Sequence, residues 1–207
     1  MVAVPNHRGV RNCGAGCLRE KTASRRLTKE DWLRLGLARL SAHGPSTLTL
    51  EQICEAAGKT KGSFYHHFSD HAAFLSALVQ EWRRMSTLAL IEAAEAMQEP
   101  QVKLRRLNRL VMEIDEPLER GVRLLADQEP RLRPSLTAVD EERIAYMAEL
   151  YRRSAPEIEG EAALIAQIEY AAFIGHLVIW PNASRKQRAE AAKAFEQLVQ
   201  GAYANRK

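Results

Sequence analysis

The spacing of apolar residues constrains this chain more than any other feature, because it follows the period of an α-helix along almost all of the 207 residues. Leu33, Leu37 and Leu40, for example, recur every three or four positions and therefore share one helix face. No alternation of single apolar and polar residues predicts a strand, and no β-branched cluster lies between turn signals. We therefore expect an all-α fold.

Glycines and prolines divide the apolar pattern into about nine expected helices. Thr28, Thr49, Thr60 and Ser184 each stand where an N-capping side chain is needed. The expected helices span residues 28–43, 50–57, 61–67, 70–97, 102–114, 117–128, 135–153, 158–180 and 184–204.

The long helix expected over residues 70–97 bridges two parts of the chain. Its predicted inward face carries Phe74, Leu78, Trp82, Met85 and either Leu88 or Ala89 at helical spacing. We divide the chain into an arm of residues 1–26, a small helical domain of residues 27–80 and a larger helical domain of residues 81–207. Pro100 separates this bridging helix from those that follow.

Charge is concentrated at the N-terminus, although the net charge is only +4. The arm holds six basic residues, two of them Arg25 and Arg26, against the single acid Glu20, which gives the arm +5 and the rest of the chain about −1. A basic arm on a near-neutral body suits a polyanionic partner, and a solvated tail is the alternative.

We expect no secretory signal, because residues 1–26 lack an apolar segment. The chain also has no run of 18 apolar residues, so we expect a cytoplasmic protein without a membrane span. Cys13 and Cys17 are separated by three residues but have no second ligand pair at zinc-finger spacing, and we expect no metal or cofactor. Cys54 is expected to be a small buried apolar residue.

Residues 47–75 hold the pattern that carries the function. Two short helices are joined by a tight turn at Gly58, which is the spacing of a helix-turn-helix. Leu50, Ile53, Ala57, Phe64 and Phe68 would pack inward. The second helix is then left with hydroxyl, lysine, histidine and small residues on its outer face, which fits the major groove of DNA.

This segment resembles the DNA-binding domain of the TetR family of regulators over about residues 27–80. The resemblance lies in TLEQICEAAG, then TKGSFYHHF, then HAAFL. It implies that Thr49 holds a phosphate and that Thr60, Lys61, Gly62, Tyr65 and His67 contact DNA, with Ser63 and His66 at variable positions. Three residues depart from the family pattern: Lys59 adds a possible phosphate contact, His71 replaces a usual lysine and puts that contact in doubt, and Cys54 replaces a usual alanine.

Other interpretations of these residues remain open. Tyr65 can be a packing residue, and Gly62 a simple turn residue, although glycine inside a helix costs about 1 kcal/mol relative to alanine. His67 and His71 would lie one turn apart if one helix continued through them, which would suggest a metal site. Ser69 and Asp70 interrupt that helix.

The C-terminal half is expected to hold a dimer interface and a ligand cavity. The resemblance implies that residues 158–180 and 184–204 of two chains form a four-helix bundle, and packing within one monomer is the alternative. Helical phase places one set of residues toward an effector cavity, which suggests a largely apolar ligand; plain core packing is the alternative. The set is Leu107, Val111, Met112, Tyr146, Met147, Tyr170, Phe173 and His176. His176, the polar member, can anchor a ligand or be a satisfied core histidine.

No catalytic motif is present: the chain lacks G-x-S-x-G, a P-loop, H-E-x-x-H and G-x-G-x-x-G. Arg123 with Asp127, and Asp140 with Arg143, are interpreted as surface ion pairs. We expect a dimeric repressor that binds a near-palindromic DNA operator and is released by a small-molecule effector. The alternatives are an architectural or cell-division factor that binds DNA without an effector, and an enzyme with an unrecognised site.

Overall fold

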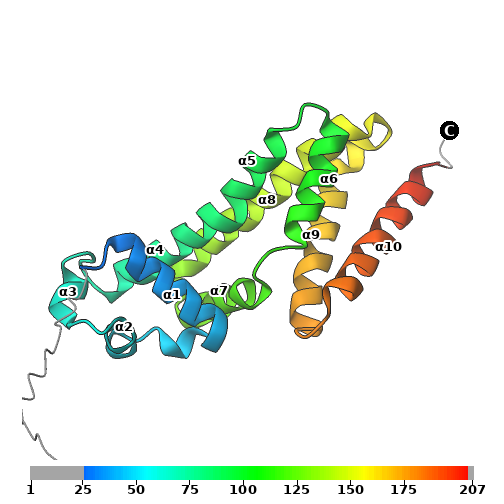
Figure 1. The fold of residues 1–207 in the computed structure, drawn as a ribbon. Coiled ribbons are helices and arrows are strands. Elements are labelled where there is room, and N and C mark those ends of the chain that lie inside the picture. Colours follow the sequence, from blue (N-terminus) through cyan, green and yellow to red (C-terminus); the bar gives the residue numbers. More distant parts are fainter. Residues whose placement is uncertain (1–25, 205–207) are drawn as a thin grey trace, which may run out of the picture.

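The computed structural model describes residues 26–204, in which every regular element is a helix (Figure 1). The predicted arm up to Arg25, with Cys13 and Cys17, lies outside the described residues. Figure 1 shows α1, α2 and α3 gathered at one end of an elongated molecule and α9 and α10 at the other. The helices are α1 Lys29–His43, α2 Leu50–Ala57, α3 Lys61–Tyr65, α4 His71–Arg83, α5 Ala89–Glu95, α6 Pro100–Val111, α7 Glu116–Gln128, α8 Arg133–Ser154, α9 Ala162–Ile179 and α10 Arg185–Ala204.

Capping side chains start the helices where the sequence predicts. The side chains of Thr28, Thr49 and Thr60 each accept a hydrogen bond from the backbone N–H three residues ahead. Ser184 and Gln187 form a reciprocal capping box before α10. The bounds of α2 are as predicted, whereas α3 ends at Tyr65, two residues earlier than expected.

The helix predicted over residues 70–97 is interrupted by a π-helical turn at Arg84–Leu88. The N–H of Ala89 bonds to the carbonyl of Arg84, five residues back, which adds one residue to the turn. The added residue rotates the inward face of the helix. Met85, predicted inward, is therefore 46% exposed, and Thr87 is buried in its place.

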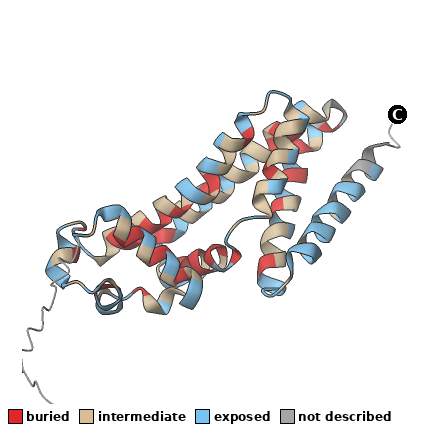
Figure 2. Cartoon of the chain, in the orientation of Figure 1, coloured by how far each residue is buried: buried red, intermediate tan, exposed pale blue. Residues whose placement is uncertain are grey.

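A single hydrophobic core crosses the predicted domain border at residue 80. The helices of the N-terminal end share this core with α7 and the start of α8, through residues such as Leu118 and Val122. Gly121 brings α7 against α1, because a Cβ there would lie 3.0 Å from the carbonyl oxygen of Leu40. Figure 2 shows the buried residues concentrated along α1, α4 and α7. The N-terminal helices are thus firmly joined to α7.

The opposite end of the molecule is less buried. Residues of α10 are exposed along most of its length, and Figure 2 shows this helix standing beside α9. Within the described residues, α9 is the one helix long and apolar enough to cross a membrane, and 28% of it is buried. Its exposed large apolar side chains include Leu164, Ile168, Val178 and Ile179.

Candidate DNA-binding surface and ligand cavity

The short helix α3 is held in place by one buried aromatic residue. Phe64 has no exposed surface, and its ring lies 5.5 Å from that of Trp32, 5.0 Å from that of Phe68 and 5.2 Å from that of Phe74. Aromatic rings at these distances attract one another beyond the gain from burial alone. The cluster therefore fixes α3 on α1 and α4 and turns its remaining side chains outward.

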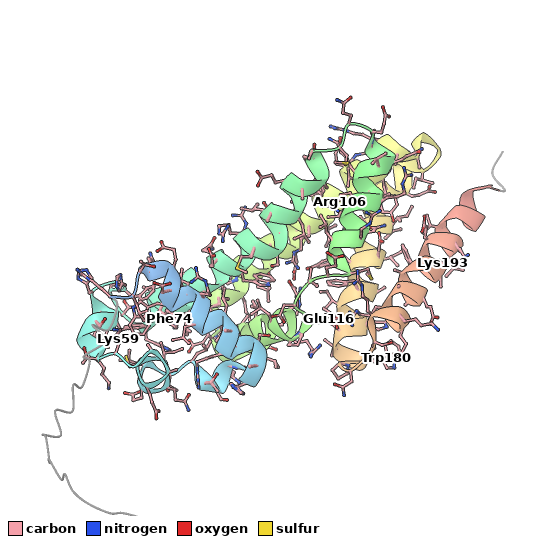
Figure 3. The ribbon with its side chains drawn as sticks, viewed as in Figure 1. Lys59, Phe74, Arg106, Glu116, Trp180 and Lys193 are labelled. Carbon is pink, nitrogen blue, oxygen red and sulfur yellow. The ribbon has the colours of Figure 1, made fainter. Side chains whose placement is uncertain are left out.

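The outer face of α3 is polar and open to solvent at the same end of the molecule as Lys59 (Figure 3). Tyr65 is 48% exposed, so packing does not account for it. Lys61 is exposed, and its Nζ lies 2.5 Å from a carboxylate oxygen of Glu51 on α2. This hydrogen bond raises the pKa of Lys61, so the ammonium group stays charged at neutral pH.

Gly62 is not required by the protein's own packing. A Cβ at this position would meet only Thr60 Oγ1, at 3.7 Å, and the backbone has an ordinary helical conformation. Gly58, in contrast, has φ of 60° and forms the turn between α2 and α3. The interpretation of Gly62 as a turn residue is therefore wrong, and space for a close partner remains as the explanation.

Two exposed threonines stand at the starts of α2 and α3. Thr49 Oγ1 accepts from the N–H of Gln52, and Thr60 Oγ1 accepts from the N–H of Ser63. A hydroxyl that accepts one hydrogen bond still has its own hydrogen to donate. Both residues can therefore cap a helix and contact a phosphate.

The histidines near α3 occupy three different environments. His66 is exposed and bonds through Nε2 to the guanidinium of Arg26. His67 is half-buried, and its ring lies edge-on to that of His66. His71 Nε2 lies 2.6 Å from the carbonyl oxygen of Leu48, which fastens the start of α4 to the segment before α2. No cluster of three metal-ligating side chains is found in the part of the chain that the structure describes.

The other two predicted residues of the surface, Lys59 and Ser63, are half-buried at the start of α3. Cys54 on α2 is buried, as predicted, and burial raises the pKa of its thiol. The structure thus brings the predicted residues of the DNA-binding surface together at one end of the molecule, apart from Arg25. DNA contact by each of them stays a prediction.

A cavity of about 170 Å³ lies between α6, α8, α9 and α10. Every residue that the sequence analysis placed toward an effector cavity lines it: Leu107, Val111, Met112, Tyr146, Met147, Tyr170, Phe173 and His176. His176 is not a satisfied core histidine, because its Nδ1 is buried without a hydrogen-bond partner among the described residues. Ligand binding by this cavity stays a prediction.

Helical phase did not reveal the polar wall of the cavity. Ser86, Thr87, Glu119, Arg143 and Glu169 also line it. Two of them face the cavity because of the π-helical turn, and the turn has no signal in the sequence that would have located it. Phe195 of α10 lines the cavity as well.

Glu119 is the centre of a buried polar network, with 1% of its surface exposed. Both terminal nitrogens of Arg143 donate to its carboxylate at 3.0 Å, and the indole N–H of Trp82 donates to it at 2.9 Å. Arg143 also donates to Thr87 Oγ1 at 2.8 Å and to the carbonyl of Ser86 at 3.2 Å, so it binds the π-helical turn. α4, α7 and α8 therefore meet at the cavity wall.

Arg123 and Asp140 extend the same network through Tyr170. Arg123 forms two hydrogen bonds with Asp140, at 3.0 and 2.9 Å, and the hydroxyl of Tyr170 donates to Asp140 at 2.6 Å. Burial raises the pKa of Tyr170 to about 12, against the opposing effect of Arg143. The predicted surface pairs of Arg123 with Asp127 and of Asp140 with Arg143 are wrong, because each arginine bonds to a carboxylate on another helix.

Comparison with known proteins agrees with this geometry. The family described as "Bacterial regulatory proteins, tetR family" matches residues 33–78, which hold α2 and α3. The transcriptional regulator AcuR of Cereibacter sphaeroides is 32% identical over 91 residues, which cover 42% of this chain and 40% of that regulator. This chain thus aligns with less than half the length of that relative.

The fold extends the similarity beyond the N-terminal helices. The crystal structure of a protein from Mesorhizobium loti, described as a TetR-family transcriptional regulator, superposes with a TM-score of 0.65 at 18% identity. The match covers 84% of this chain and 96% of that one, and it shows a shared all-α fold. The helix-turn-helix of this chain therefore matches the DNA-binding domain of the TetR family of bacterial regulatory proteins, and the similarity of the remaining helices is one of fold.

Proposed function

We propose that this protein is a dimeric transcription repressor that binds a near-palindromic DNA operator through α3 and is released by a small effector in the cavity. The observation that carries the DNA-binding part is the outer face of α3, where Lys61, Tyr65 and His66 are exposed around Gly62. An exposed polar helix with a bare backbone position suits the major groove.

Three substitutions on α3 test DNA recognition. Lys61→Ala should weaken binding to every sequence about equally, because a lysine on a phosphate carries no sequence information. His66→Ala should cost about 1–3 kcal/mol on the preferred operator and relax the choice at one base pair. Tyr65→Phe removes only the hydroxyl and separates packing from DNA contact.

The measurement is fluorescence anisotropy on an operator selected from random duplexes, with a scrambled duplex at the same salt concentration. Circular dichroism establishes that each variant is folded. If all three folded variants bind both duplexes as the unmodified protein does, α3 is not the reading helix and the proposal fails.

The outward face of α9 supports the homodimer. Leu164, Ile168, Ala171, Gly175 and Val178 follow one another at intervals of four and three residues, the spacing of a helix-packing seam. A Cβ at Gly175 would meet nothing within 4 Å, so this glycine serves no packing within the monomer. Small residues at the middle of the seam let a partner helix approach closely. The same seam accounts for the apolar character of α9 without a membrane.

Charge placed on this seam tests the dimer. Leu164→Glu combined with Ile168→Glu should give a folded monomer with much weaker operator binding, because two half-sites are then no longer bound together. Gln167→Glu is the matched control, since Gln167 is exposed on the same helix but lies off the seam. Light scattering gives the molecular mass of the seam variant, the control variant and the unmodified protein in solution. An unmodified protein that is monomeric at micromolar concentration contradicts the homodimer.

Glu119 connects the cavity to the DNA-binding end in this proposal. It lines the cavity and also bonds to Trp82, which belongs to the core shared with α1 and α4. An effector that binds one arrangement of this network better than another shifts the population of α4 positions. The DNA-binding ends of two protomers, held about 34–36 Å apart, dock in successive major grooves, and a change in that separation releases DNA.

Trp82→Phe tests the connection, because it keeps most of the packing and removes the N–H that bonds to Glu119. With a compound found by thermal-shift screening, we expect the variant to bind the compound as before but to release operator less readily. Equal release by the variant and the unmodified protein would place the connection elsewhere.

A further inference from the structure

The cavity wall carries four charged residues, and one of them has no ion-pair partner among the residues that the structure describes. Arg143 is paired with Glu119, and Arg188 of α10 is paired with Glu116 of α7. Glu169 of α9 also lines the cavity, but no ion pair is found for it among the residues that the structure describes. A carboxylate in a largely apolar cavity is costly unless a cation accompanies it.

The charge that acts most directly on Glu169 is that of another carboxylate, although the cations Arg105, Arg109 and Lys193 line the groove between α6 and α10 that Glu169 also lines. One of its oxygens accepts a hydrogen bond of 2.7 Å from the hydroxyl of Tyr151, and Glu196 on α10 lies close enough for its charge to act on it. Burial and Glu196 raise the pKa of Glu169, and the bond from Tyr151 opposes them. The site around this carboxylate is therefore one that a positive group would stabilise.

Glu169 stands at the boundary of two spaces. It lines the cavity of about 170 Å³, and it also lines a wider groove of about 910 Å³ between α6 and α10. Asn108, Met112 and Ala192 line both spaces too. A ligand that occupies the cavity next to this boundary can therefore place a polar group at the carboxylate and its apolar part in the cavity.

The stripe of α9 beyond Glu169 is aromatic. Phe173 follows it by four residues and His176 by seven, so all three share one helix face toward the cavity. The rings of Phe173 and Tyr170 lie 6.0 Å apart. Aromatic faces attract cations, and the unpartnered Nδ1 of His176 gives a polar contact at the far end of the stripe.

Resting on the proposed function of the cavity, we propose that its effector is a small organic cation, an amine whose ammonium group binds Glu169 and whose apolar body lies against Phe173. A cavity of about 150 Å³ holds benzene, so the space here suits a body of about that size. Benzylamine is therefore a suitable probe, with benzyl alcohol as its neutral counterpart and benzoate as its anionic one.

The experiment measures binding of these three probes to the full chain by calorimetry and thermal shift. We expect benzylamine to bind at least tenfold more tightly than benzyl alcohol or benzoate. Glu169→Gln keeps an oxygen that accepts from Tyr151, and it should weaken benzylamine binding at least tenfold while leaving benzyl alcohol unchanged. Glu190→Gln removes a carboxylate from an exposed position on α10 and should bind all three as the unmodified protein does.

The inference is overturned if benzyl alcohol or benzoate binds as well as benzylamine, if no probe binds at millimolar concentration, or if Glu169→Gln binds benzylamine normally. The comparison of probes on the unmodified protein needs no variant, so it holds even if Glu169→Gln fails to fold. Operator binding is measured in the same preparations. A chain that binds operator but releases it only with an anion would retain the proposed function and lose this inference.

Discussion

Removing the positive charge of Arg143 should unfold the protein at a much lower temperature, because Glu119 would be left charged and buried. In Arg143→Met an apolar stem remains, but the guanidinium group, whose carbon lies 4.7 Å from the centre of the Trp82 ring, is lost. Glu119, 1% exposed, loses both hydrogen bonds from the arginine and keeps only the one from Trp82.

The size of the loss follows from that geometry. Breaking a buried pair by removing one partner costs about 3–5 kcal/mol, because the other charge stays without compensation. For a chain of this length each kcal/mol lowers the melting temperature by about 2–4 °C, so Arg143→Met should melt roughly 6–20 °C lower. Combining it with Glu119→Gln removes the stranded charge, and the amide oxygen still accepts from Trp82. The double variant should therefore be more stable than Arg143→Met.

Calorimetric melting at one protein concentration is the assay. Arg153→Met is the control, because Arg153 lies on the same helix and forms an exposed pair with Glu149, which contributes little to stability. If Arg143→Met melts within the range of this control, or if Glu119→Gln adds to the loss instead of relieving it, the network does not stabilise the fold in the way its hydrogen bonds indicate.

Four further changes have expected outcomes. Gly62→Ala should stabilise the fold by up to about 1 kcal/mol while weakening binding to all duplexes, and unchanged anisotropy would show that DNA does not approach this backbone. Glu51→Gln should free Lys61 and tighten DNA binding by no more than roughly fivefold, because exposed ion pairs are weak. Deletion of residues 1–24 should lower the slope of log affinity against log salt by about one unit for each phosphate that the arm neutralises in the unmodified protein, without changing the selected operator. Glu169→Gln should raise the melting temperature near pH 7, with the gain vanishing in melts below about pH 4, since the raised pKa of Glu169 favours the folded state only while the carboxyl is protonated.

The pH dependence expected for Glu169→Gln follows from the groups around Glu169. The hydroxyl of Tyr151 on α8 donates a hydrogen bond to Glu169, and the charge of Glu196 on α10 raises the pKa of Glu169. The cations Arg109 and Lys193 line the groove between α6 and α10 but do not contribute to the shift of that pKa. A carboxyl whose pKa is raised on folding takes up protons more readily when folded, so its contribution to stability is lost as the pH rises through its folded pKa. Glutamine does not titrate, so the melting temperatures of Glu169→Gln and of the unmodified protein become similar at low pH.

The sequence was sufficient for the parts of the fold that local rules determine. Capping residues, glycine in the turn at Gly58 and helical phase placed the helix-turn-helix and the apolar wall of the cavity, because each depends on neighbours within four residues. The sequence was insufficient where partners lie far apart in the chain. Arg143 bonds to Glu119 and to the π-helical turn, whereas the sequence analysis paired it with Asp140, three residues before it on the same helix.

The π-helical turn is the clearest case, because Arg143, which bonds to it, lies 56 residues away in the chain. A helix that takes in an added residue leaves backbone carbonyls without their usual partners, and here Arg143 donates to the carbonyl of Ser86 and to Thr87 Oγ1. The same arginine binds Glu119, whose other partner is Trp82 in the core of the DNA-binding end. An effector that displaces Arg143 would therefore act on the turn and on Trp82 at once. A regular α-helix through Arg84–Leu88 would shift the phase of α4 by one residue, so an effector that favoured the regular helix would rotate α4.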